Sequence, residues 1–184
     1  AKGHLLIEDL PGVGILFHEL AHQKIYIDDD SSFNEAFATA VEQEGVKRWF
    51  VYKHQYDKLA EFKQHLTRKN EFNSLLLQYR NVLKTLYKSK SNKKEILLEK
   101  KRVFNKLKQD YALLKLKWNG YTGYDKWMNQ ELNNAHLAII STYNDLVPLF
   151  SKKINESHNI SIFYEYIVNL SKYDIKKRKK LLNY

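Results

Sequence analysis

Three residues near the start of the chain have the types and spacing of a catalytic metal site. His18 and His22 are four residues apart, and Glu19 follows the first of them, which gives the pattern H-E-x-x-H. On a helix, residues four apart lie on one face, so two imidazoles at this spacing can bind one zinc ion. The glutamate can take a proton from a water molecule that the zinc activates for attack on a carbonyl. The pattern therefore predicts a zinc-dependent hydrolase with Glu19 as its general base.

The residues around the motif favour this interpretation over a bland alternative, in which two surface histidines pair with neighbouring carboxylates. Residues 14–17 and 20–21 carry no charge. A surface helix is seldom so apolar around its histidines. We therefore expect the motif on a buried helix.

A catalytic zinc site needs a third protein ligand, and the sequence predicts a carboxylate because no further histidine follows at short spacing. The candidates are Glu35, Glu42, Glu44 and the acidic turn at residues 28–30. If two antiparallel helices carry His22 and Glu35, both residues lie within about one turn, roughly 5 Å, of the connecting loop. Glu42 lies roughly 10 Å further along the axis. Glu35 is therefore the expected ligand.

An alternative for Glu35 stays open at this point. Ser32-Phe33-Asn34-Glu35 also fits a capping box, in which Glu35 would bond the backbone of Ser32. Glu35, Thr39 and Glu42 share one helical stripe with small residues between them, which suits a close approach to the first helix. We expect Glu42 and Thr39 behind the ligands, with Glu42 holding a ligand histidine or binding a substrate amine.

Zinc peptidases usually also donate a hydrogen bond to the oxyanion that forms during hydrolysis. His136 and Tyr143 are candidates for this catalytic role. The candidate substrate-binding residues are Tyr121, Tyr124, Asn133 and Asn134. The alternatives are ordinary: a histidine satisfied by Asn133, and tyrosines that pack in the core.

Helices must position these residues, and the sequence predicts a mainly α-helical chain with little or no sheet. Proline occurs twice and glycine six times, and apolar residues recur with the helical period. An extended stretch is expected at 25–27, and a glycine-containing break at 118–124. The predicted helices cover about residues 11–24, 33–45, 46–66 (as a separate helix or a continuation), 70–87, 93–114, 129–142, 145–155 and 161–171.

Composition predicts one domain over residues 1–184, with a basic tail at 172–184. A hydrophobic fraction of 43% is enough for a core, and the absence of cysteine excludes disulfides, thiolate metal sites and cysteine nucleophiles. No apolar run approaches the roughly 20 residues of a membrane-spanning helix. No signal peptide pattern opens the chain.

The net charge of +10 is concentrated in two segments. From Lys84 to Lys117 twelve basic residues face three acids, and from Lys172 to Lys180 six face one. These charges fall between apolar helical positions, as on a solvated outer face. They also allow a rival function, a basic helical binding module with an inactive or incomplete metal site. Its partner would be an anionic membrane surface or nucleic acid, and the membrane is the better candidate because no zinc finger, RNP or P-loop motif is present.

Five segments carry a family pattern. They are FHELAHQ at 17–23, DDSSFNEAFATAVE at 29–42, WNGYxGYD at 118–125, LNNAHLA at 132–138 and YxDLVP at 143–148. Together they span about Ile15 to Phe150 and resemble a family of predicted bacterial zinc aminopeptidases. The resemblance implies a gluzincin-like, helical zincin domain with Zn²⁺ as cofactor and a peptide substrate that is cut near its N-terminus.

The resemblance has three further implications. The Asn34-Glu35-Ala36 step resembles the third-ligand motif of thermolysin-like enzymes, and so supports Glu35. Family members are often carried to the cell envelope by a lipoprotein signal, which implies an envelope or periplasmic location. They also carry a substantial region before the metal helix, whereas 17 residues precede His18 here. The resemblance therefore implies that this chain is the C-terminal part of a longer protein.

Overall fold

In the computed structural model, the structure describes residues 12–89, 92–137 and 146–183, which form helices and turns without any strand. The expected mainly helical class is confirmed. The chain divides into two compact units, unit 1 with residues Ala1–Lys63 and Thr142–Tyr184, and unit 2 with residues Gln64–Ser141. The expectation that the whole chain acts as one domain stays a prediction.

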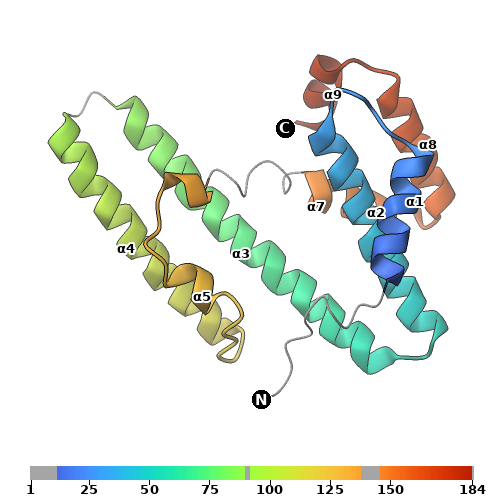
Figure 1. Ribbon diagram of the computed structural model, residues 1–184, viewed down its shortest axis with the longest axis horizontal. Helices are drawn as coiled ribbons and strands as arrows, with labels where there is room; N and C mark the ends of the chain where they lie inside the picture. The colour runs from blue at the N-terminus through green and yellow to red at the C-terminus, as the bar shows by residue number, and fades with distance from the viewer. Residues whose placement is uncertain (1–11, 90–91, 138–145, 184) are drawn as a thin grey trace. The chain divides into compact units, whose positions relative to one another are not determined.

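Unit 1 is a helical bundle built around buried phenylalanines. Its helices are α1 (Val13–Lys24), α2 (Ser31–Tyr52), the start of α3 (Tyr56–Lys88), α7 (Leu146–Ser157), α8 (Ile160–Ser171) and α9 (Ile175–Leu182) (Figure 1). Phe33 of α2 packs edge-on against Phe150 of α7, and Phe37 lies against Phe163 of α8. All four rings are fully buried. The core therefore ties α2, which carries the candidate acids, to the C-terminal helices.

A short loop joins α1 to α2 and turns the chain back on itself (Figure 1). The side chain of Asn34, buried in the first turns of α2, bonds the backbone of Ile27 twice: its Oδ1 accepts from the Ile27 N–H at 3.0 Å, and its Nδ2 donates to the Ile27 carbonyl at 2.7 Å. Asp30 caps α2 by accepting from the Phe33 N–H. The expected extended stretch at 25–27 is thus a loop segment held by α2, without a sheet.

Glycine lets α1 and α2 approach closely. A Cβ atom added to Gly45 would lie 2.4 Å from the ring of Phe17, closer than any real contact. Of the two expectations for residues 46–66, a separate helix or a continuation, the structure has a continuation at first: α2 passes Gly45 and ends at Tyr52, and α3 begins at Tyr56. This glycine makes room for an aromatic ring from α1, so it serves helix packing and does not end the helix.

Unit 2 is an antiparallel helical hairpin, with the rest of α3 against α4 (Lys93–Lys117) (Figure 1). The Tyr79 hydroxyl donates to Asp110, and the Trp118 indole N–H donates to Glu71. The expected break follows α4, and then come α5 (Asp125–Met128) and a helical turn at 134–137. The helix expected at 129–142 is wrong over residues 129–133, which form a turn and loop, and its residues 138–142 lie outside the described residues. In the part of the chain that the structure describes, we find no helix with the length and apolarity that a bilayer crossing requires.

Candidate metal centre

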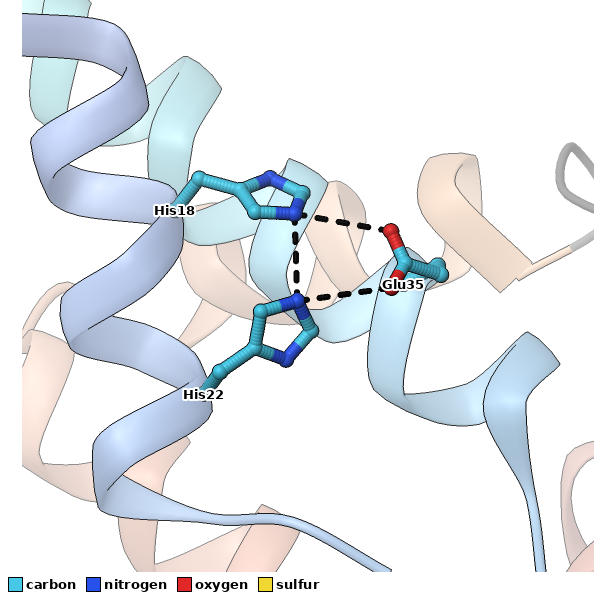
Figure 2. Close-up of side chains that lie close together, drawn as sticks. All are labelled: His18, His22 and Glu35. Atoms are coloured by element: carbon cyan, nitrogen blue, oxygen red, sulfur yellow. Dashed lines mark hydrogen bonds and ion pairs between the residues drawn. The ribbon is translucent and has the colours of Figure 1, made fainter.

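Three side chains from α1 and α2 converge on one point. His18 and His22 project from α1 toward the carboxylate of Glu35 on α2 (Figure 2). The two Nε2 atoms lie 3.1 Å apart, and each lies 3.4 Å from a different oxygen of Glu35. Within the described residues, these three form the group of side chains able to hold a metal ion.

Helical spacing brings the two histidines together, and the loop brings Glu35 to them. His22 lies near the end of α1, and Glu35 lies near the start of α2. Asn34 precedes Glu35 and fixes the loop at Ile27, so the rotation of α2 about its axis is set one residue before the acid. Figure 2 shows the carboxylate directed between the two rings.

Glu42 lies behind His18. Its Oε2 is 3.1 Å from Nδ1 of His18. An ionised carboxylate only accepts hydrogen bonds, so a neutral His18 carries its proton on Nδ1 in this contact and keeps the lone pair on Nε2. Thr39, on the same helix between the two acids, is half-buried and forms no hydrogen bond to either histidine. Glu42 therefore turns the lone pair of His18 toward His22 and Glu35.

When both histidines are neutral and both Nε2 atoms are unprotonated, the atoms that meet at the centre are all acceptors and repel one another unless something positive lies between them. If Nε2 of His22 carries a proton, it can donate that proton to Nε2 of His18. The lone pair on Nε2 of His18 then still faces the negative Oε2 of Glu35 without a positive group between them. A divalent cation compensates all three contacts together. Ligands about 2.0–2.1 Å from a tetrahedral zinc ion are about 3.3–3.4 Å apart. Here the two Nε2 atoms are 3.1 Å apart and each lies 3.4 Å from its own oxygen of Glu35, while one ligand atom from each residue lies within 4.8 Å of the others. The donor set and its spacing fit zinc.

The centre is open on one side. The Glu35 side chain is 42% exposed, and Glu19, next to His18, is exposed as well. The expectation that the apolar flanks bury the motif is only half right, because Gly14 and Ala21 are buried against α2 while Ile15, Leu16 and Leu20 are exposed in the described chain. The physical reason is that α1 packs against α2 through one face, which includes Phe17, whereas Ile15, Leu16 and Leu20 lie outside it.

The other acids considered as ligands have separate partners. Oε1 and Oε2 of Glu44 pair with Arg48 and Lys47. Burial works to raise the pKa of Glu44, but the hydrogen bonds from Arg48 and Lys47 outweigh it and hold the pKa below its usual value. Asp30 pairs with Arg178, and Asp28 and Asp29 are exposed. Neither Glu44 nor the acidic turn joins the centre.

The capping-box alternative for Glu35 is wrong in this structure. The N-cap of α2 is Asp30, whose side chain accepts from the Phe33 N–H at 3.2 Å. The helix therefore begins two residues before Phe33. Since Ser32 lies inside the helix, Glu35 is not needed for capping, and its carboxylate faces the histidines.

The remaining candidates of unit 2 contact neighbouring residues of the same unit. Asn133 caps the turn at 134–137, and Nδ1 of His136 accepts from the Asn133 N–H. Tyr124 stacks on Phe72 with ring centres 4.1 Å apart, and burial raises the pKa of Tyr124 to about 12.

Of the three other candidates, two also contact residues of unit 2 and one lies outside the described residues. Tyr121 packs under the guanidinium of Arg68. Asn134 bonds the hydroxyl of Tyr87. Tyr143 lies outside the described residues. Catalytic or substrate-binding roles for these residues stay predictions.

Gly14 of α1 lies beside Glu42 and was not among the candidate site residues. A Cβ atom at this position would lie 3.4 Å from Oε1 of Glu42, an ordinary contact distance, so Gly14 marks where α1 and α2 lie close together beside that carboxylate. The signal was present in the sequence as a glycine one helical turn before His18, on the same face.

Comparison with known proteins gives one match. A family model described as "Putative aminopeptidase" matches residues 7–182. No curated protein and no solved structure matches the chain significantly.

Proposed function

Because the chain belongs to the family described as "Putative aminopeptidase", we propose that it is a zinc-dependent peptidase whose metal ligands are His18, His22 and Glu35. The family description supports peptide-bond hydrolysis. The observation that carries the zinc proposal is the convergence of the Nε2 atoms of His18 and His22, 3.1 Å apart, with the Glu35 carboxylate, whose two oxygens each lie 3.4 Å from one of them.

A zinc ion bound there would supply a Lewis acid, which lowers the pKa of a water molecule and polarises a peptide carbonyl. Glu19 lies beside His18 with its carboxylate exposed. In the proposed mechanism Glu19 accepts a proton from the attacking water, whose oxygen bonds to the carbonyl carbon. Glu19 then returns this proton to the nitrogen of the C–N bond as that bond breaks.

Glu42 and Glu35 have different parts in this mechanism. Glu42 holds the Nδ1 proton of His18 and so keeps its ring in the ligand orientation. Glu35 supplies the negative charge between the two rings. With three protein ligands, a fourth position stays available for water or substrate, as a catalytic zinc site requires.

Hydrolysis tests the proposal directly. The protein is freed of metal with a chelator, then assayed with and without one equivalent of zinc on matched peptides with free and acetylated N-termini. Zinc-restored cleavage of the free peptides supports a zinc aminopeptidase, and equal cleavage of both supports an endopeptidase. Full activity in the metal-free protein rejects the zinc mechanism.

The cellular location and the binding to a membrane surface stay predictions that the metal centre does not bear on. A cell-envelope location rests on the family resemblance, and contact with an anionic membrane rests on the lysines of α4 and α9. Within the described residues we see no specific feature that favours the rival binding module, and the complete set of His18, Glu19, His22 and Glu35 argues against a degenerate metal site.

A further inference from the structure

Arg178 on α9 brings a positive charge into the interior of unit 1. Its side chain is 2% exposed, although the surrounding segment is the most basic part of the C-terminus. Nε donates to Oδ2 of Asp30 at 3.0 Å, and Nη2 lies 2.9 Å from the same oxygen. Nη1 donates to the carbonyl of Tyr173, and the guanidinium lies against the ring of Phe33. A buried charge is costly unless it is paired, so this arrangement is specific.

Asp30 connects Arg178 to the loop between α1 and α2. Its Oδ1 accepts from the Phe33 N–H at the start of α2, and its own N–H donates to the carbonyl of Ile27. The side chain of Asn34 bonds the backbone N–H and carbonyl of Ile27. Arg178 therefore holds the loop at Asp30, and Asn34 holds it at Ile27.

This loop sets the distance between His22 and Glu35. His22 lies before the loop and Glu35 after it, and the two side chains meet with 3.4 Å between Nε2 and Oε1. A small shift of the first turn of α2 would change this contact directly. Among the residues that the structure describes, Arg178 and Asp30 are the buried charged side chains, and Nη2 of Arg178 also lies 3.8 Å from Oδ1 of the exposed Asp29 in the same loop.

We propose that Arg178 is a positioning residue for the metal centre: by holding Asp30, it fixes the first turn of α2 and so keeps Glu35 opposite His22. This inference rests on the proposed metal role of the triad. It gives the basic C-terminal segment a function at the site, more than 140 residues after the histidines. Arginine is needed there because lysine presents one point charge and cannot reach Asp30 and the Tyr173 carbonyl with a planar fork.

The test compares Arg178→Lys with Leu182→Ala, a variant of the same helix that removes core packing but does not touch Asp30. Zinc affinity is measured by competition with a chelating dye, and amide hydrogen exchange of Ile27 is followed in the metal-free protein. Arg178→Lys should weaken zinc binding by about tenfold or more, as loss of an outer support of a ligand does, and should speed exchange at Ile27. Leu182→Ala should lower the melting temperature and leave both readouts within about twofold of the parent.

A double variant, Asp30→Ser with Arg178→Met, covers the case in which the single variant does not fold. Serine keeps a capping oxygen, and no unpaired charge remains buried. If this folded variant binds zinc as the parent does, the positioning role is overturned. If the parent itself binds no zinc, the metal proposal fails separately. Exchange at Ile27 then decides the inference, with faster exchange supporting it and unchanged exchange rejecting it.

Discussion

Nδ1 of His18 lies 3.1 Å from Oε2 of Glu42, which stands 24 residues later on the facing helix. The contact favours the tautomer of neutral His18 that carries its proton on Nδ1. It also places Glu42 one layer behind the three proposed ligands, so the two acids on one stripe of α2 have different tasks. Glu35 contacts both histidines, and Glu42 contacts one.

Glu42→Ala should lower zinc affinity by about 10–100-fold, because His18 loses the partner that orients its ring. Glu42→Gln should recover most of this loss, since its amide oxygen still accepts from Nδ1–H. Zinc titration in competition with a chelating dye measures both. Equal weakening in the two variants would mean that the charge of Glu42 matters and the orienting hydrogen bond does not.

Glu35→Ala should cost more zinc affinity than Glu42→Ala, above about 100-fold, because it removes a direct ligand. The stability of the metal-free protein should change by no more than about 0.5 kcal/mol, since the side chain is partly exposed and Asp30 caps the helix. Zinc titration and thermal melts without metal measure the two effects. A loss of about 1 kcal/mol with zinc binding intact would instead indicate a capping role for Glu35.

Glu19→Gln should bind zinc like the parent and lose at least about 10²-fold in hydrolysis rate. The amide keeps the shape of the side chain but cannot accept the proton from water. Initial rates are compared at equal zinc occupancy, which removes any difference in metal binding. An active Glu19→Gln enzyme would exclude Glu19 as the general base.

Gly45→Ala should destabilise the protein by about 1–3 kcal/mol through overpacking, although the same change inside a helix usually stabilises by about 0.5–1 kcal/mol. The added Cβ would meet the Phe17 ring at 2.4 Å. Gly14→Ala is the matched control, because its Cβ meets Glu42 at an ordinary 3.4 Å. Urea unfolding of both variants checks this, and a stabilised Gly45→Ala would show that Phe17 does not pack against that position.

Much of the centre could be predicted because it depends on local spacing. The four-residue interval between His18 and His22 places two imidazoles on one helix face wherever that helix lies. The convergence with Glu35 required only a short loop and antiparallel helices, and the structure has both. That the three residues bind zinc stays a prediction.

Other features could not be predicted because they depend on contacts between distant segments. Gly45 resembled a helix end because its partner, Phe17, lies 28 positions away in the sequence. In the sequence, Arg178 resembled the solvated basic residues around it, and no feature of the neighbouring residues indicates that its partner is Asp30. The exposure of Leu16 and Leu20 likewise depends on which face of α1 meets α2.

The most direct test of the central claim is the zinc content of the purified protein. Elemental analysis of the parent, prepared without chelator and dialysed against trace zinc, should give about one zinc per chain. The same preparation of His22→Ala should retain little zinc, because the change removes one of the three ligands. A parent protein without zinc, or a His22→Ala variant that keeps a full equivalent, would contradict the metal centre proposed for His18, His22 and Glu35.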